Sequence, residues 1–486
     1  MLITAGIVLR LLTELAYHPA IVYIDSLKYL YGAWPGSDPV AYKVPIKLIT
    51  GFGGGLGTIE LVQHLLGVAI AVALYMLLIR RGIPKWLGAL AIAPILLDAY
   101  QLQVEAMIMP DIWFEAFIAA GLIVLLWKPV PSLPVLMIAG AIFGASVGFR
   151  QVGEVLLVPA VVYVAALRGG WRKVVQRASA VTIAFVIAVL FYLSASYQLT
   201  GHFWISRSSV SLTYGRMAAV ADCTTLTLPP IERSLCPSRK QQSYGPDWLD
   251  HSINSPLRTY ASALPANRDQ LVVNFNRSVE RQQPLRVVAG ILRDSVKLFA
   301  LTRHTSPGDT PIWRWQFQTS FPSYQPWVKV DNNKIWVTLG TLQLNSVEQL
   351  KTSYGGSPQV DKPIASFLRG YQLNGGYTPG PLFAICLIAG LIGSVLALTR
   401  RRLGRNPAAR DLAIACLAFF ATGALVLGVS DVFEFTWRYQ LPALVTLPPA
   451  GALGIGVLIL AARKSREPVA ADAVSERAPE MAAPAP

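Results

Sequence analysis

The chain has 486 residues, of which 53% are hydrophobic and only 14% are charged, and its mean hydropathy is +0.46. This composition is too apolar for an ordinary soluble protein and indicates a membrane protein. In such a protein the formal net charge of +15 reflects where Lys and Arg lie around the spans, so we expect no nucleic-acid partner.

The hydropathy pattern predicts about ten transmembrane helices, which makes the chain an α-helical polytopic membrane protein. The first apolar run, residues 2–17, is short and contains Arg10 and Glu14. We interpret it as a span whose polar side chains face other helices, because charges within the apolar run argue against a cleaved signal peptide. The other predicted spans are 59–79, 86–104, 108–127, 131–149, 152–167, 178–197, 379–399, 411–429 and 440–462.

The predicted spans divide the chain into regions of different character. Residues 1–197 form an N-terminal bundle with a first outer loop, and residues 379–466 form the last helices. Between spans seven and eight, residues 198–378 contain no credible span and are rich in Tyr, Trp, Arg and Pro, which predicts a large extracytoplasmic domain. Residues 467–486 are rich in Ala, Pro and Glu and have no apolar face, which predicts a disordered cytoplasmic tail.

Lys and Arg are concentrated in alternate short loops. Positively charged loops stay in the cytoplasm, so both termini are predicted to be cytoplasmic and residues 18–57 extracytoplasmic. We therefore expect a multi-pass protein of a bacterial plasma membrane whose active site faces outside. The predicted cytoplasmic basic residues are Arg80, Arg81, Lys85, Lys128, Arg168, Arg172, Lys173, Arg177, Arg400, Arg401, Arg402, Arg405, Arg410, Arg463, Lys464 and Arg466.

Two of the four cysteines, Cys223 and Cys236, lie in the long polar region, whereas Cys386 and Cys416 lie within apolar runs. Extracytoplasmic compartments are oxidising, so the first pair is predicted to form a disulfide. Zinc is a poorer interpretation of this pair, because no nearby His or further Cys completes a four-ligand set. The sequence assigns no metal ligands.

Most ionisable residues of the predicted spans lie near their outer ends. Placing one such group in lipid costs roughly 2.5 to 3.5 kcal/mol on insertion scales, so we expect these residues to line a shared polar cavity. A pump would place its charges nearer the middle of the membrane, so the one-sided pattern favours chemistry at the outer surface. The residues are Asp25, Asp98, Glu105, Asp111, Glu115, Arg150, Glu154, Asp431, Glu434 and Arg438.

Local interactions are an alternative interpretation of several of these residues. Arg150 and Glu154 have the i,i+4 spacing of an ion pair within one helix. Glu434 and Arg438 have the same spacing. Asp98 has the alternative role of a cap or an anchor at the membrane interface.

Asp111 and Glu115 also share a helix face, but like charges at this spacing repel each other. They need a cation, a metal or another arginine nearby. A divalent cation is therefore a candidate cofactor, although no ligand set for it is assigned.

Four short stretches, taken together, resemble the GT-C class of polytopic glycosyltransferases, and the nearest similarity is to actinobacterial phospholipid-carrier-dependent members. They are YIDSLKYL at 23–30, VQHLLG at 62–67, VEAMIMPD at 104–111 and RYQLP at 438–442. In the large outer region, three short stretches contribute to the same similarity: GR at 215–216, ADC at 221–223 and LCP at 235–237. The resemblance covers the order of elements over most of the chain.

The resemblance implies transfer of a sugar from a polyprenyl-phosphate carrier to a hydroxyl of a glycan, lipid or protein acceptor. It implies that Asp25 in the first outer loop is the general base, and that Glu105 or Asp111 is the second acidic residue. Two departures are visible: Ser26 stands where many members have a second acid, and residues 39–45 contain no His.

The chemistry of this transfer requires a base near the acceptor and cations near the departing phosphate. Arg binds phosphate oxygens bidentately, so Arg150 and Arg438 are the first phosphate-binding candidates, followed by Lys43. His64 and Glu115 are further candidate site residues. Inversion at the anomeric carbon is implied by the class.

Other functions fit a chain of this composition. A membrane transporter or lipid-carrier flippase of envelope biosynthesis is the alternative to the glycosyltransferase, and inverted repeats or charges at mid-span would favour it. A non-catalytic assembly partner in envelope synthesis is a third interpretation, and it predicts that Asp25 tolerates substitution. In each case membrane lipid surrounds the protein.

Overall fold

The computed structural model describes residues 1–30, 37–167, 169–206, 208–261, 268–320, 328–331, 334–337, 343–344, 359–399 and 406–464. The chain is 74% helical, which confirms the predicted helical class. The predicted tail at 467–486, the basic segment 400–405 and the basic residues Arg168 and Arg466 lie outside the described residues.

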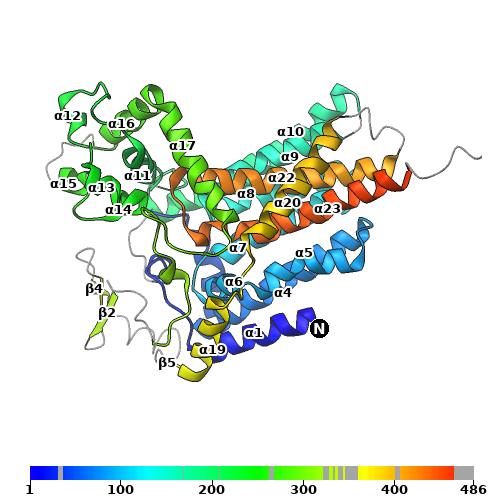
Figure 1. Cartoon of the computed structure of the whole chain (residues 1–486), viewed down its shortest axis with the longest axis horizontal. Helices are drawn as coiled ribbons and strands as arrows, with labels where there is room; N and C mark the ends of the chain where they lie inside the picture. Colours follow the sequence, from blue (N-terminus) through cyan, green and yellow to red (C-terminus); the bar gives the residue numbers. More distant parts are fainter. Residues whose placement is uncertain are drawn as a thin grey trace, which may run out of the picture.

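The N-terminal part of the chain forms a bundle of helices (Figure 1). Its elements are α1 (Leu2–Ala16), β1 (Tyr17–His18), α2 (Ser26–Leu30), α3 (Lys43–Gly51), α4 (Leu56–Arg80), α5 (Lys85–Leu97), α6 (Ala99–Ala106), α7 (Asp111–Leu126), α8 (Leu133–Ser146), the 3₁₀ helix η1 (Gln151–Leu156), α9 (Leu157–Ala166) and α10 (Trp171–Thr200).

The described part of the long polar region consists mainly of short helices. They are α11 (Ser209–Val220), α12 (Pro230–Arg233), α13 (Arg239–Gln242), α14 (Gly245–His251), α15 (Pro256–Ala261), α16 (Arg268–Gln282), α17 (Pro284–Ser295), η2 (Val296–Phe299), η3 (Ile312–Trp315) and α19 (Lys362–Leu373). The described strands of this region are β2 (Val328–Asp331), β3 (Lys334–Val337), β4 (Gln343–Leu344) and β5 (Gln359–Val360). The last part of the chain adds α20 (Gly380–Leu398), α22 (Pro407–Phe433), η4 (Trp437–Gln440) and α23 (Pro442–Lys464).

Two small antiparallel sheets accompany the helices. In one, β1 pairs with β5, so Tyr17 faces Val360. In the other, the strand order is β2-β3-β4, and Ile335 pairs with both Val330 and Leu344. The first sheet attaches the end of the polar region to the first outer loop.

Four described helices are long and apolar enough to cross a membrane: Leu56–Arg80, Trp171–Leu199, Pro407–Phe433 and Trp437–Ala462. A fifth crossing results if the bent pair α5 and α6 counts as one span. The predicted spans at 131–149, 152–167 and 379–399 coincide with shorter apolar helices.

At the predicted span 86–104 the helix breaks at Asp98, and its two halves are bent by 49°. The Asp98 carboxylate caps α6 by accepting the backbone N–H of Tyr100 at 3.0 Å. It also forms an ion pair of 2.6 Å with Arg303 of the polar region. The carboxylate therefore stabilises the break and anchors the polar region to it.

Small residues allow the closest helix packing in the bundle. A Cβ atom at Gly140 of α8 would collide with the backbone of Val181 in α10. Only glycine fits at this crossing, so the two helices approach more closely than side chains would permit, as is common between membrane helices.

Buried apolar side chains form two clusters. The larger one fills the bundle and extends to Trp315 and Phe317, so the end of the polar region packs on the helices. The smaller one surrounds Tyr214 and Phe275 of α11 and α16, whose ring centroids lie 5.5 Å apart. The disulfide between Cys223 and Cys236 lies beside this second core.

The two ends of the bundle differ. In Figure 1 the N-terminus and the turn between α4 and α5 lie at one end, and helices α11 to α17 lie at the other. At the first end, Arg80 and Arg81 donate hydrogen bonds to the backbone carbonyls of Trp127 and Leu126 at the close of α7. Basic turns that are distant in sequence therefore meet at the end opposite the polar domain.

Candidate functional site

The first outer loop places Asp25 between β1 and α2. Ser26, which stands where a second acid was considered, is buried, and its hydroxyl accepts the backbone N–H of Tyr23 at 2.9 Å. The backbone of Ile21 pairs with Ala106 and Ile108 at 3.1 Å each. The loop is thus attached to the connection between α6 and α7, directly before Asp111.

Arg438 of η4 joins the two aspartates. Its Nε and Nη2 atoms donate to the two carboxylate oxygens of Asp111 at 2.9 Å each, and its Nη1 donates to Asp25 at 2.6 Å. Arg438 is only 6% exposed, and the two aspartates lie 413 and 327 positions away in the sequence. The planar guanidinium, with its several fixed donors, suits this double contact.

Two further cations complete the group. Arg150 donates to Asp111 at 2.5 Å, and Lys28 contacts Asp25 at 3.0 Å and also pairs with Asp38. Every carboxylate oxygen of the partly exposed Asp25 and of the buried Asp111 therefore faces a cation. We call this group the Arg438 cluster; its members are Asp25, Lys28, Asp38, Asp111, Arg150 and Arg438.

Aromatic rings surround the arginines of the cluster. Arg438 lies 5.3 Å from the centroid of the Trp315 ring, and Trp315 packs at 5.0 Å against Tyr23. Arg150 lies 4.5 Å above the ring of Tyr439. Trp315 belongs to the long polar region, so the cluster lies where that region meets the bundle.

The cations dominate the electrostatics of Asp25. Burial acts to raise the pKa of this carboxyl, but Lys28 and Arg438 outweigh burial and hold the pKa well below its usual range. In turn Asp25 and Asp38 raise the pKa of Lys28 against the opposing effect of burial. In this state Asp25 is ionised but a weak base, because its lone pairs are committed to cations.

A group of acids borders the cluster. Burial raises the pKa of Glu434, and the neighbouring Asp247 raises it further, against His251 and Arg314. Arg314 forms an ion pair of 3.1 Å with Asp247 in α14. The polar region therefore contributes both charge signs near the first outer loop.

Glu105 does not join the Arg438 cluster. It lies in a second buried network, where it accepts from Arg10 at 2.7 Å and contacts Nδ1 of His64 at 2.9 Å. Gln101 donates to Glu105 at 3.3 Å and to Glu115 at 2.8 Å. The sequence-predicted site residues thus divide into two groups, with Asp25, Asp111, Arg150 and Arg438 in one and Glu105, His64 and Glu115 in the other.

Arg10 behaves as expected for a polar residue of α1 that faces other helices. Its guanidinium donates to the backbone carbonyls of Ile95 and Leu96 at 3.0 and 3.1 Å, at the end of α5. Gly67 of α4 makes room for this contact, because a Cβ there would lie 2.8 Å from Nη2 of Arg10 and would collide with Glu105.

The local ion pairs considered as alternatives are not formed. Arg150 pairs with Asp111 rather than with Glu154, and Arg438 pairs with both aspartates rather than with Glu434. The repulsion expected at Asp111 is relieved by these arginines.

One phosphate-binding candidate lies apart from the others. Lys43, at the start of α3, is half-buried and makes no ion pair with any described residue. The lysine that contacts Asp25 is instead Lys28, which sequence reasoning missed. The available signal was the i,i+3 spacing of Asp25 and Lys28, whereas nothing local indicated that Asp38 and Trp315 would approach.

A divalent cation does not fit between Asp25 and Asp111 in this arrangement. Their oxygens are already bound by Arg438, Arg150 and Lys28, so a metal would meet cations rather than free carboxylate oxygens. What the cluster offers chemically is a set of cations next to a carboxylate.

No family model matches the chain, and searches of curated proteins and of solved structures also found no match.

Proposed function

We propose that this protein is an integral-membrane glycosyltransferase that moves a sugar from a polyprenyl-phosphate carrier to an acceptor hydroxyl on the outer face of a bacterial plasma membrane. The observation that carries the proposal is the Arg438 cluster. It gathers three carboxylates and three cations from four distant parts of the chain, at the border between the apolar bundle and the polar domain.

The membrane arrangement belongs to the same proposal. About ten helices would cross the bilayer, with both termini in the cytoplasm. The meeting of basic turns at the end of the bundle opposite α11 to α17 supports this orientation (Figure 1). This orientation would place the Arg438 cluster on the extracytoplasmic side.

The cations of the cluster would bind the donor phosphate. The donor phosphate is a diester whose single negative charge is shared by two oxygens, as in a carboxylate, and Arg438 and Arg150 can bind these oxygens bidentately. As the bond to the anomeric carbon breaks, negative charge accumulates on the departing phosphate. Guanidinium groups fixed in a partly dry site stabilise that charge more strongly than water does.

Binding of the donor phosphate to these cations would also activate Asp25. When the donor phosphate draws Arg438 and Lys28 toward itself, Asp25 loses the partners that depress its pKa. The released carboxylate can then accept the proton of the acceptor hydroxyl as the oxygen attacks. Attack opposite the departing phosphate would invert the anomeric centre.

Asp111 fits the second acidic role better than Glu105 does. Its bidentate contact fixes the guanidinium plane of Arg438, whereas Glu105 is engaged by Arg10 and His64 in another network. We therefore assign Asp111 to orienting Arg438, and we do not assign Glu105 to the transfer step.

The test is the variant Asp25→Asn. It keeps the size of the side chain and removes the base, so transfer from a radiolabelled polyprenyl-phosphate sugar to endogenous acceptor in membranes should fall by about two to four orders of magnitude. Asp269→Asn, at an exposed position of α16, is the matched control. Transfer that persists in Asp25→Asn protein of normal abundance would refute the assignment of the base.

A flippase or transporter is the second candidate, and one observation favours it. The network of Arg10, His64 and Glu105 is buried among α1, α4 and α6, and buried ionisable groups within membrane helices often mark transport pathways. This function predicts that lipid-carrier movement across reconstituted vesicles survives Asp25→Asn and fails in Glu105→Gln. The glycosyltransferase predicts no carrier movement in either protein.

A further inference from the structure

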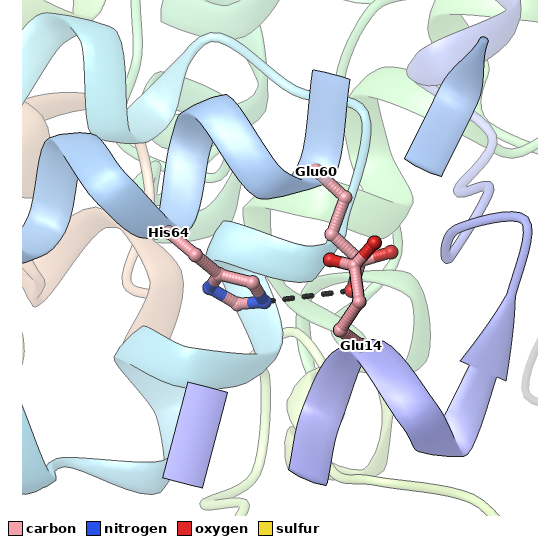
Figure 2. A group of neighbouring side chains, drawn as sticks. All are labelled: Glu14, Glu60 and His64. Atoms are coloured by element: carbon pink, nitrogen blue, oxygen red, sulfur yellow. Dashed lines mark ion pairs between the residues drawn. The ribbon is translucent and has the colours of Figure 1, made fainter. Parts of the chain in front are cut away.

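Three polar side chains meet between α1 and α4, outside the Arg438 cluster. Glu14 comes from the last turn of α1, and Glu60 and His64 come from successive turns of α4 (Figure 2). One donor atom from each lies within 4.8 Å of the others. We call these three residues the Glu60 triad.

The triad consists of polar atoms that lack hydrogen bonds. Both carboxylate oxygens of Glu60, one oxygen of Glu14 and Nε2 of His64 are buried without a hydrogen-bond partner. Glu60 is fully buried and His64 is 2% exposed. Leaving one such group unpaired costs about 1 to 3 kcal/mol, and more for a charged group. Four unpaired atoms that face each other therefore indicate a bound species that satisfies them together.

A direct contact between the imidazole and the carboxylate does not satisfy them. Nε2 of His64 lies 3.5 Å from Oε1 of Glu60, which is beyond the usual 2.7 to 3.2 Å of an N–H···O hydrogen bond. Metal bonds of about 2.1 Å in a tetrahedral site place neighbouring donor atoms about 3.4 Å apart. The separation therefore suits two ligands of one ion.

The partner of the other imidazole nitrogen orients His64. Nδ1 lies 2.9 Å from Glu105, and Glu105 is held in place by Arg10. A carboxylate is an acceptor, so Nδ1 carries a hydrogen, and in the neutral imidazole that binds a metal Nε2 would present its lone pair toward Glu60 and Glu14. A carboxylate behind a metal-binding His is the usual support of such a ligand.

From this geometry we infer that the Glu60 triad binds one divalent cation, with Nε2 of His64 and a carboxylate oxygen each from Glu14 and Glu60 as ligands. When Glu14, Glu60 and Glu105 are ionised, these three carboxylates share a single arginine, and a divalent ion would remove the resulting deficit of positive charge. The inference does not depend on glycosyl transfer, since none of these ligands belongs to the Arg438 cluster.

The ligand types select the ion. One imidazole and two carboxylates suit Zn²⁺ and its neighbours among the transition metals, whereas Mg²⁺ prefers six oxygen ligands in octahedral geometry and retains its water. Glu14 is only half-buried, so it is the side from which an ion enters.

The ion would fasten α1 to α4 at the level of the first outer loop. Gln63, next to His64, donates to the backbone carbonyls of Glu105 and Met107 at 2.6 and 2.8 Å. The connection between α6 and α7, to which these carbonyls belong, also pairs with Ile21, a few residues before Asp25. The ion would therefore act on the loop through α4 and would be a positioning element, not a participant in the reaction.

The experiment uses the full-length protein in detergent, purified without a histidine tag and stripped with EDTA. Titration with ZnCl₂ alone, followed by desalting and elemental analysis, should give about one zinc per chain. Glu60→Gln and His64→Gln should each weaken binding by at least about 100-fold, and Glu105→Gln by about 10- to 100-fold. Co²⁺ should give the visible absorption bands of a low-symmetry site in wild type and lose them in His64→Gln.

Matched variants distinguish this site from other sources of zinc. Glu232→Gln removes a buried glutamate of α12 and should bind zinc as wild type does. Asp25→Asn should also retain zinc, so loss of transfer with zinc retained separates the two proposals.

Zinc binding that is absent from wild type, or that is unchanged in both Glu60→Gln and His64→Gln, would overturn the inference. A cooperative thermal unfolding transition shows that each purified variant is folded. Added zinc should raise the Tm of wild type but not the Tm of Glu60→Gln or His64→Gln.

Discussion

The Arg438 cluster and the Glu60 triad are both buried polar groups, yet they are satisfied in different ways. In the cluster three carboxylates are matched by three cations, and each oxygen of Asp25 and Asp111 has a cationic partner. In the triad two carboxyl groups and one imidazole nitrogen face each other, and four of their atoms have no hydrogen-bond partner. We propose that the first group exchanges one anion for another, whereas the second binds a cation.

This difference shows how the balance of charge, rather than the presence of acids, indicates the ligand. Asp111 and Glu60 are both buried carboxylates at the start of helices in the bundle. Arginines surround one, and an imidazole nitrogen with a second carboxyl group lies beside the other. A search for acidic residues alone would treat them as equivalent.

The largest expected effect is the difference in protein stability between variants that neutralise Asp111 and Glu60. Asp111→Asn leaves Arg438 and Arg150 partly unpaired and should destabilise the protein by about 3 to 5 kcal/mol. Glu60→Gln in metal-free protein removes a carboxyl group whose two oxygens have no hydrogen-bond partner, so stability should stay the same or rise. Thermal unfolding of both variants in EDTA measures the contrast. Equal destabilisation by the two substitutions would remove the distinction between the groups.

The next effect concerns the geometry of Arg438. Arg438→Lys keeps one positive charge but cannot bind Asp111 through two nitrogens while also reaching Asp25. Transfer from a polyprenyl-phosphate sugar should fall by about 10²- to 10³-fold, because a fixed donor to the developing phosphate charge is lost.

The control for this change is Arg286→Lys. Arg286 makes an exposed ion pair with Asp222 in the polar domain and lies outside the cluster. Its substitution should leave transfer within about twofold of wild type. If Arg438→Lys were equally active, a simple point charge would be sufficient and the bidentate argument would fail.

The sequence predicted the helices far better than the contacts between them. Long apolar runs identify α4, α10 and α22 because hydropathy is a local property. The pairing of Arg438 with Asp25 is not local, and spacing alone favoured a pair with Glu434 that does not form. The break at Asp98 likewise depends on a distant residue, Arg303, which no hydropathy window contains.

Part of each candidate site was nevertheless visible in the sequence. The sequence predicts a site role for Asp25, Asp111, Arg150 and Arg438 because charges near the ends of spans are costly unless they are paired or used. The same argument applies to Glu105, but its position on α6 directs it to Arg10 and His64.

A smaller effect tests the support behind the triad. Gly67→Ala introduces a methyl group against Arg10 and Glu105, so the carboxylate that orients His64 must move. We expect destabilisation of about 1 to 3 kcal/mol from overpacking. Zinc binding should also weaken by about tenfold, because the carboxylate partner of the imidazole is displaced. Thermal unfolding and zinc titration measure the two effects.

Gly370→Ala is the matched glycine control, since a Cβ there meets no atom within 4 Å. Gly370 lies within α19, where alanine should be neutral or slightly stabilising. Zinc affinity that is unaltered in Gly67→Ala would mean that Glu105 does not support the ligand.

The smallest effect concerns the acids that border the Arg438 cluster. Glu434 has a pKa raised by burial and then by Asp247, above the ordinary value of 4.5, so the folded protein holds a proton there that the unfolded chain releases. Between the ordinary and the raised pKa the folded state binds more protons, so the stability of wild type falls as pH rises through that window. Glu434→Gln removes this dependence.

Thermal unfolding of wild type and Glu434→Gln at about pH 5 and about pH 8 tests the sign. The variant should gain stability relative to wild type at the higher pH, whereas Glu232→Gln should not, because Glu232 lies apart from these acids on α12. A difference between wild type and Glu434→Gln that is constant with pH would mean that Glu434 is ionised in the folded protein. Glu434 would then belong with the charge-balanced carboxylates of the Arg438 cluster rather than at its border.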